Sequence, residues 1–266
     1  MQLFESFEQN CEKIPVQSFA KECERMSMLA KEKEKVLSES PQNEIVRTEF
    51  CNCIGKVALP RGYYAPTPVQ EHLMGNITRG RLANSLSKAK NCVASFAYGL
   101  DKNGRIIKIS YYAQGILSGI EYLENEEEQT LGLMKTNSAV CLREERYREG
   151  KIEQYSTFFA EHGMLSLITE HYWYKKNRLV QAAYADYRNM AEAADLFGGL
   201  GLSSERGKER VSMQIYHLTY DEDFLTAFQY TDFLNGEKRY TGKENRLSLP
   251  AHIHNAPARR CWLQAY

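Results

Sequence analysis

The stretch Asp101-Lys102-Asn103-Gly104-Arg105-Ile106 decides the fold, because Asn-Gly between runs rich in apolar and aromatic residues is a strong hairpin signal. Three further turn signals follow it along the chain: Arg148-Glu-Gly-Lys151, Lys176-Asn-Arg178 and Asp221-Glu-Asp223. The first aliphatic residues after the first and third turns, Ile106 and Leu179, lie 73 residues apart, and Ile152 and Leu225 after the other two turns have the same spacing. A unit that returns at a fixed period indicates a duplication.

The turn signals predict one large antiparallel sheet over residues 95–235, built from two copies of a hairpin pair. Residues 1–94 are predicted to form helices and a connecting segment, and residues 236–266 an irregular tail of the same domain. A chain of 266 residues can bury a sizeable core. We therefore expect an α+β fold, with N-terminal helices packed on a large twisted antiparallel β-sheet of duplicated hairpins.

Helical spacing of apolar residues is clearest near the start of the chain. It is found over residues 4–14, before Pro15, and again in a second run that contains Phe19, Cys23, Met26 and Ala30. We expect Ser18 to cap the second helix. These helices are predicted to cover one face of the sheet.

The segment that joins the helices to the sheet carries mixed signals. Residues 45–59 favour a strand or two, and the proline-rich stretch 60–68 is predicted to be a rigid, exposed loop. Thr67 and the following proline indicate a short helix to Met74. The polar residues 79–90 are a further helix candidate.

The predicted strands carry large apolar groups on both faces. Leu167 and Trp173 share one face of the run 165–174, and Tyr172 and Tyr174 share the other, so we expect part of the second face to be covered. Along residues 211–220 the apolar side chains move from odd-numbered to even-numbered positions. This change of parity predicts a β-bulge near Tyr216.

The amino-acid composition limits the classes of function that the chain can have. The 34 basic and 34 acidic residues give a net charge of zero, so no global field attracts nucleic acid or an anionic membrane. The basic residues of 143–151 are interspersed with glutamates, which favours solvated hairpin ends over a nucleic-acid stripe. The first residues lack a secretory signal, and no apolar run approaches the roughly 20 residues that span a bilayer. The seven cysteines are predicted to be free thiols of a cytoplasmic protein.

No motif predicts a cofactor or a metal. His252 and His254 with Cys261 form the nearest approach to a metal cluster, but a structural site normally needs four ligands in recognisable pairs, and Cys51 and Cys53 could complete a set only through long-range folding. The stretch 201–208 has the wrong glycine spacing for a phosphate-binding loop. We therefore predict no cofactor and no metal.

Two other classes of function stay open. An enzyme could assemble a dispersed site from strands, since Glu170 precedes His171 and His217 lies near Asp221, although neighbours on a strand face opposite sides. A homo-oligomeric structural protein, such as a homodimer, could form through the edges of the sheet.

The turn at Asp101–Ile106 followed by Tyr111-Tyr112, and Tyr220-Asp221 leading to Tyr230, resemble the YD-type hairpins found around bacterial polymorphic toxins. The small helical start, the twisted antiparallel sheet and the lack of a catalytic motif are also similar to the immunity proteins of those systems. The resemblance covers residues 95–235 and implies a cytoplasmic, non-catalytic protein that binds and blocks a cognate toxin or effector. No individual residue role transfers with it.

Tyrosine is the outlier of the composition, with 17 residues, and aromatic side chains frequently anchor protein interfaces. The residues predicted to contact the partner are Tyr172, Trp173, Tyr174, Tyr184 and Tyr187. An acidic connection over 121–137 supplies the residues predicted to steer a partner of opposite charge, which are Glu126, Glu127 and Glu128.

Overall fold

The computed structural model describes residues 16–37, 44–74, 76–87, 92–136, 139–161, 164–189, 209–221 and 224–250. The first elements are α1 (Val16–Leu37), β1 (Arg47–Ile54), β2 (Val57–Ala58), the 3-10 turn η2 (Gly62–Tyr64), α2 (Gln70–Met74), β3 (Ile77–Thr78) and β4 (Arg81–Ala83). The longer strands are β5 (Cys92–Leu100), β6 (Ile106–Ala113), β7 (Ile116–Asn125), β8 (Gln129–Lys135), β9 (Ala139–Arg148), β10 (Lys151–Glu161), β11 (Met164–Lys175), β12 (Arg178–Asn189), β13 (Glu209–Asp221), β14 (Phe224–Leu234) and β15 (Glu237–Pro250).

Most of the described chain belongs to one antiparallel sheet of 13 strands, which confirms the predicted sheet and its α+β character. From β5 to β15 the strands follow one another in chain order, and β1 and β4 complete the sheet beside β5. Strands β2 and β3 form a separate parallel pair. Helix is a smaller part of the fold than the sequence predicts, because α1 is the one long helix among the described residues.

The chain divides into two compact units. Unit 1 contains the described residues of Met1–Glu32, Asn137–Glu144 and Glu153–Ala251, and unit 2 contains those of Lys33–Thr136 and Glu145–Ile152.

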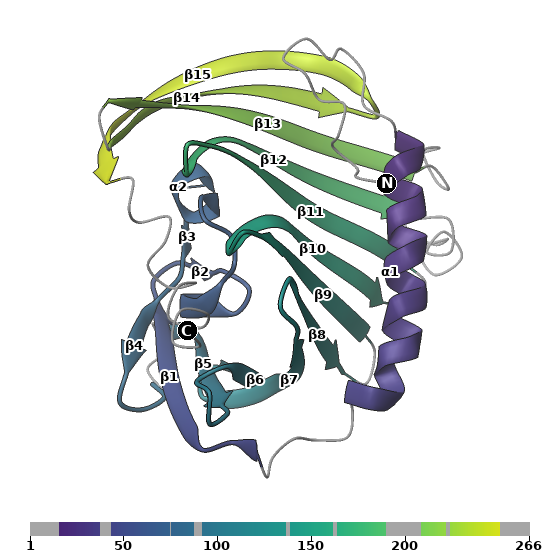
Figure 1. Cartoon of the computed structure of the whole chain (residues 1–266), viewed down its shortest axis with the longest axis vertical. Helices are drawn as coiled ribbons and strands as arrows, with labels where there is room; N and C mark the ends of the chain where they lie inside the picture. The colour runs from purple at the N-terminus through teal and green to yellow at the C-terminus, as the bar shows by residue number, and fades with distance from the viewer. Residues whose placement is uncertain are drawn as a thin grey trace. The chain divides into compact units, whose positions relative to one another are not determined.

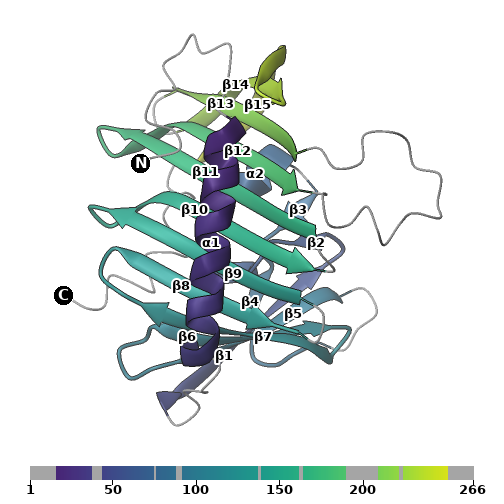
Figure 2. The same ribbon diagram turned by 90° about the vertical axis from the view of Figure 1, so that its right-hand side faces the viewer.

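In unit 1, α1 lies across one face of strands β10 to β13 (Figures 1 and 2). The four predicted apolar positions of this helix are all buried, which confirms their role: Phe19, Cys23, Met26 and Ala30. The helix begins at Val16, so Ser18 lies inside it and does not cap it. The predicted helix over residues 4–14 lies outside the described residues.

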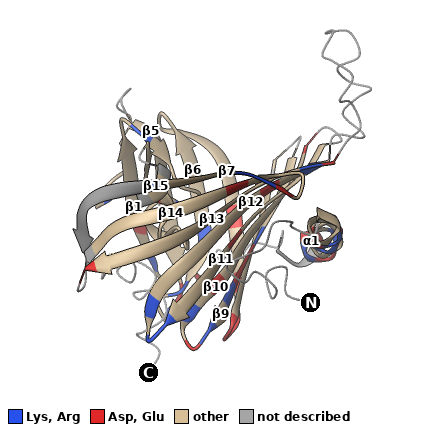
Figure 3. Cartoon of the chain, turned by 90° about the horizontal axis from the view of Figure 1, so that it is seen from above, with Lys and Arg blue, Asp and Glu red and all other residues tan. Residues whose placement is uncertain are grey.

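The face of the sheet that meets α1 carries a row of large apolar residues. Leu167 is paired with both Phe158 and Tyr187, and Tyr187 is paired with Val211, so the four side chains share one face. Each of the four is at most 2% exposed. In Figure 3 most of the length of strands β10 to β14 is tan, and the charged residues lie mainly toward the strand ends.

The parity change in β13 has a different cause from the predicted bulge. Burial shifts from Ile215 to Tyr216, yet the pairing with β14 is continuous there, and the register shift lies later, between Thr219 and Tyr220. Tyr216 is buried because its ring packs against Phe228, at a centroid distance of 5.7 Å. The change of parity therefore reflects cover on the second face of the strand.

The predicted Asn-Gly hairpin joins β5 and β6 in unit 2. The Asp101 carboxylate accepts hydrogen bonds from the backbone N–H groups of Asn103 (2.8 Å) and Arg105 (2.9 Å), which fixes the turn. The apolar core of this unit includes Cys51, Phe96, Tyr98, Ile109 and Leu123.

Three predicted segments fold differently from the expectation. Residues 81–83 form edge strand β4, paired with β1, and are not part of a helix. The connection predicted over 121–137 contains the end of β7 and strand β8, which pair with each other. Residues 237–250 form β15 and are not an irregular tail, because Asn235-Gly236 is itself an Asn-Gly turn with both φ angles positive.

The predicted hairpins are present as β5–β6, β9–β10, β11–β12 and β13–β14. Strands β7 and β8 separate the first two hairpins. The connection between the last two hairpins, residues 190–208, lies outside the described residues.

Candidate functional site

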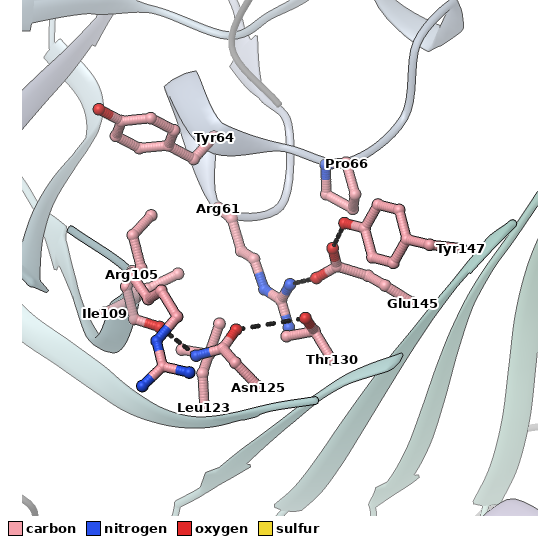
Figure 4. Close-up of a pocket in the computed structure, with 11 residues that line it drawn as sticks. Arg61, Tyr64, Pro66, Arg105, Ile109, Leu123, Asn125, Thr130, Glu145 and Tyr147 are labelled. Carbon is pink, nitrogen blue, oxygen red and sulfur yellow. Dashed lines mark hydrogen bonds and ion pairs between the residues drawn. The ribbon is translucent and has the colours of Figure 1, made fainter. Parts of the chain in front are cut away.

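A pocket of about 40 Å³ lies in unit 2 (Figure 4), and it has room for about three water molecules or one small functional group. It is lined by Arg61, Tyr64, Pro66, Arg105, Ile106, Ile109, Leu123, Asn125, Thr130, Glu145 and Tyr147.

The backbone of Arg61 is held in a rigid arrangement between β2 and η2. Its φ of 64° is left-handed, a conformation that few residues other than glycine adopt without support from their surroundings. The support comes from Tyr98, whose hydroxyl donates to the Arg61 carbonyl (2.8 Å) and accepts from the N–H of Tyr63 (3.1 Å). The chain turn at Arg61 therefore directs its side chain inward.

The Arg61 guanidinium forms a buried ion-pair network with two glutamates. Its Nη2 lies 2.6 Å from Oε1 of Glu121 on β7, and its Nη1 contacts Oε1 of Glu145 on β9. The side chain of Arg61 is 3% exposed, and those of Glu121 and Glu145 are 0% and 6% exposed. A side chain at position 132 on β8 would collide with both Glu121 and Arg61, so glycine there leaves room for the pair.

Two tyrosines satisfy further lone pairs of the same carboxylates. The Tyr111 hydroxyl donates to Glu121, and the Tyr147 hydroxyl donates to Glu145. Buried charges are tolerated when they are paired and hydrogen-bonded in this way.

The rest of the pocket combines an apolar floor with a polar rim. Ile109, Leu123 and Tyr64 supply apolar surface, while the Thr130 hydroxyl donates to the Asn125 amide oxygen (3.2 Å). Arg105 on the rim pairs with Asp101 at 2.8 Å. Burial opposes ionisation of Asp101, but hydrogen bonds from Arg105 and Asn103 outweigh it and lower the pKa of Asp101 below its ordinary value. Arg105 is therefore neutralised locally.

The carboxylates of the network are engaged by a guanidinium and by phenols, and no histidine is found among the described residues that line the pocket. Within the described ranges, no group of three or more His, Cys, Asp and Glu side chains is arranged to hold a metal ion.

The predicted steering residues lie beside this pocket. Glu126, Glu127 and Glu128 are exposed in the turn between β7 and β8, whose flanking residues Asn125 and Thr130 line the pocket. The turn is fixed by hydrogen bonds from the N–H of Glu126 to the Gln129 carbonyl and from the N–H of Tyr147 to the Glu128 carbonyl, both 2.8 Å long.

The five predicted aromatic contacts lie in unit 1. Tyr172 and Tyr187 are each 2% exposed, and their hydroxyls donate to Glu170 and Glu209. Trp173 is half-buried, with its ring centroid 4.4 Å from that of His171. Tyr174 and Tyr184 are also half-buried, and burial raises the pKa of Tyr184 to about 12.

These aromatic residues do not form one patch. Tyr184 is paired with Glu170, and Tyr172 follows Glu170 by two residues, so Tyr172 and Tyr184 share a face. Tyr187 belongs to the opposite face, in the row that meets α1. Of the predicted tyrosines, Tyr174 and Tyr184 keep partly exposed rings.

Sequence reasoning missed the central residues of the pocket. The loop predicted to be exposed contains Arg61, which is 2% exposed, and the charges predicted to be solvated include Glu144 (1%) and Glu145 (5%). The available signal was the proline-rich stretch around Arg61, since a rigid loop often carries a functional group. The glutamates gave no signal of their own, because a buried and an exposed glutamate look alike in a sequence.

The predicted candidates His252, His254, Cys261 and the stretch 201–208 lie outside the described residues. No known protein family, curated protein or solved structure matches the chain. No helix in the described part of the chain is both long and apolar enough to cross a membrane.

Proposed function

We propose that this chain is a non-catalytic protein-binding protein, and that its partner is a toxin or effector whose action it blocks. The observation that carries the proposal is the turn Glu126–Glu128 beside the pocket of unit 2. Three adjacent exposed carboxylates on a fixed turn favour a basic partner, and they steer its approach.

The pocket supplies the second part of a binding site. A pocket with an apolar floor, and with rim polar groups that are already hydrogen-bonded within the chain, can accept one anchoring side chain of a partner. Its size limits the anchor to a small group or the tip of a larger one. The network around Arg61 holds the pocket wall in place before binding, which lowers the entropy lost on association.

The equal 73-residue spacing of the hairpin turns supports a related proposal, that the hairpin sheet arose by duplication. The acidic turn then lies in the connection between the two hairpins of the first copy.

The test is affinity purification of the tagged chain, with partners identified by mass spectrometry and complex size measured by gel filtration. The variant Glu126→Gln/Glu127→Gln/Glu128→Gln is compared with Glu24→Gln/Glu32→Gln/Glu237→Gln, which removes the same charge from other exposed positions. We expect a stoichiometric basic partner that binds the control variant and the unchanged chain alike. Its loss from the turn variant, and its weakening at high salt, would support the proposal.

Inhibition is tested on the partner so identified. Coexpression with the unchanged chain should relieve the partner's toxicity or suppress its activity, and coexpression with the turn variant should not. A partner that both triple variants bind equally, or a chain that elutes as a dimer with itself and no other protein, would contradict the proposal.

A further inference from the structure

An aromatic cluster lies on one face of strands β13 to β15 in unit 1, and its members are Tyr216, Phe228, Tyr230 and Tyr240. The centroids of neighbouring rings lie 5.7 to 6.3 Å apart. The exposed fraction rises across the cluster: Phe228 and Tyr216 are 2% and 6% exposed, Tyr230 is half-buried, and Tyr240 is 57% exposed. The rings of Tyr230 and Tyr240 are therefore the two that a ligand can reach.

The register of the strands brings Asp232 into the same surface. Tyr230 is paired with Tyr216 on β13 and with Gly242 on β15, and Asp232 follows Tyr230 by two residues on the same face. Asp232 is in turn paired with Tyr240. Directly opposite residues of antiparallel strands have Cβ atoms about 5 Å apart, so the side chain of Asp232 lies beside the most exposed ring.

Gly242 gives the Tyr230 ring its place on β15. A Cβ atom at position 242 would lie 2.6 Å from Cζ and 2.7 Å from Oη of Tyr230, which is closer than a side chain tolerates. The ring therefore packs directly on the backbone of the edge strand, and Gly242 beneath it is buried. Any larger residue at this position would displace the ring from the cluster.

The Asp232 carboxylate has an unsatisfied oxygen. Its Oδ1 is buried and accepts no hydrogen bond, while the residue as a whole is half-buried. In the described chain no lysine or arginine pairs with Asp232, and no cation lies over the Tyr240 ring. A buried carboxylate oxygen without a partner costs free energy, which a bound cation would recover. The carboxylate therefore has acceptor capacity for a ligand.

Another tyrosine of unit 1 already binds a cation of the chain itself. Arg178, at the start of β12, places its guanidinium 5.1 Å from the ring centroid of Tyr220 on β13. That distance is within the roughly 6 Å over which the face of a ring attracts a cation. At Tyr220 the chain thus supplies both the ring and the cation, whereas at Tyr240 it supplies a ring and a carboxylate.

We propose that Tyr230, Tyr240 and Asp232 bind an organic cation, either an ammonium or a guanidinium group. Both rings can attract the positive charge through their faces, and the carboxylate attracts it directly. The ring planes are tilted by 56°, which suits a compact cation, because its attraction to each ring does not require the rings to be parallel. Lysine and arginine side chains of a protein carry such groups, and so do small quaternary ammonium compounds.

Other occupants fit this surface less well. A neutral sugar could stack on one ring, but it would leave the charge of Asp232 unmatched. A nucleic acid would bring phosphate groups against the carboxylate. A second copy of the chain that docked through the same cluster would bring two Asp232 carboxylates together, since a two-fold contact uses the same surface on both copies.

The site shares no residue with the acidic turn or with the pocket of unit 2. Its test therefore uses the full chain and small probes, and does not depend on the proposed partner. The tyrosine rings are labelled for NMR, and the chain is titrated with choline, with capped lysine, with capped arginine and with dimethylbutanol, the uncharged molecule of the same shape as choline. We expect saturable shifts of the Tyr230 and Tyr240 ring signals with the cations, and at least about tenfold weaker binding of dimethylbutanol.

The cationic probes also distinguish the two sources of the ligand. Choline stands for a free quaternary ammonium compound, and the capped amino acids stand for a side chain of a protein. Saturable binding of either kind supports the proposal, and the tighter probe identifies the source. Dimethylbutanol that bound as tightly as choline would overturn the proposal, and so would the absence of a saturable shift with every cation.

Variants locate the site on the sheet. Asp232→Asn should weaken binding of the cations by about fivefold, because it removes the charge and keeps the shape. Tyr240→Leu removes one ring and should weaken binding by about threefold. The controls Asp221→Asn, at an exposed position of β13, and Tyr112→Leu, at a half-buried position of unit 2, should leave the affinity unchanged.

Folding of each variant is checked by circular dichroism. The comparison of choline with dimethylbutanol needs no variant, so it stands even if a substitution disturbs the edge of the sheet. Equal affinity for choline in the unchanged chain and in folded Asp232→Asn/Tyr240→Leu would place the cation elsewhere and overturn the assignment.

Discussion

The interior between α1 and the sheet of unit 1 differs in kind from the interior around Arg61 in unit 2. Unit 1 joins apolar side chains of α1 to an apolar row on its sheet, as Met26 and Leu167 illustrate, both 0% exposed. Unit 2 also has an apolar core, but it encloses the ion-pair network of Arg61, Glu121 and Glu145. Apolar contacts are non-directional and tolerate changes of similar volume, whereas a buried charge network requires every member. The interior around Arg61 should therefore tolerate substitutions less well than the interior beneath α1.

That difference bears on function. In unit 2 the Tyr98 hydroxyl holds the left-handed turn at Arg61, and the ion-pair network fixes one wall of the pocket. The buried charges thus specify a single arrangement of the site. In unit 1, Arg25 of α1 reaches the buried carboxylate of Glu144, which is 1% exposed, at 2.5 Å. The Arg25 side chain is 37% exposed, so one charge of this pair keeps contact with water.

The largest expected effect tests the network. Arg61→Met removes the cation and leaves two carboxylates buried without it, and we expect the free energy of unfolding of unit 2 to fall by about 4 kcal/mol. Hydrogen exchange of the β7 and β8 amides measures the change within that unit. The variant Arg61→Met/Glu121→Gln/Glu145→Gln buries no net charge and should recover about 2 kcal/mol. A loss below about 1 kcal/mol for Arg61→Met would mean that the two interiors tolerate substitution equally well.

A somewhat smaller effect is expected from the apolar interior of unit 1. Met26→Ala creates a cavity between α1 and the sheet and should lower the free energy of unfolding by about 3 kcal/mol. Met26→Leu conserves volume and should cost less than about 1.5 kcal/mol. Exchange of the β11 and β12 amides reports the change. If Met26→Leu proved as harmful as Met26→Ala, the interior of unit 1 would not be the tolerant one.

The same contrast explains what the sequence could predict. Periodicity identified Phe19, Cys23, Met26 and Ala30 as the buried face of α1, and turn chemistry located the hairpins, because both signals are local. The network of unit 2 joins residues from three distant segments, and no local pattern distinguishes Glu121 from the exposed glutamates that follow it. Strand β15 was missed although its Asn235-Gly236 turn is a local signal, because polar and charged residues follow that turn and favoured an irregular tail.

Alkaline pH should weaken unit 1 through Cys23. Burial first, and then the carboxylates of Glu209 and Glu22, raise the pKa of Cys23 from 9.0 to about 11. Below pH 9 both the folded and the unfolded chain keep the proton. Between pH 9 and 11 the unfolded chain releases it first, so stability falls as pH rises, by about 1.4 kcal/mol at pH 10. Urea unfolding at pH 7 and pH 10 measures the loss, which should be smaller in Cys23→Ala. Equal losses in the two proteins would remove Cys23 as the cause.

The smallest effect concerns an ion pair of unit 2 that resembles the network in chemistry but not in burial. Lys33 Nζ lies 2.6 Å from Glu124 Oε2, and the two side chains are 19% and 32% exposed. Water solvates the charge that remains when one partner is removed, so Lys33→Gln should cost about 0.5 kcal/mol, and less at high salt. Denaturant unfolding of Lys33→Gln and Arg61→Met, side by side, then measures what burial adds to the loss of one cation within the same unit. If the two losses were similar, the low tolerance of unit 2 to substitution would have to come from its backbone geometry and not from its buried charges.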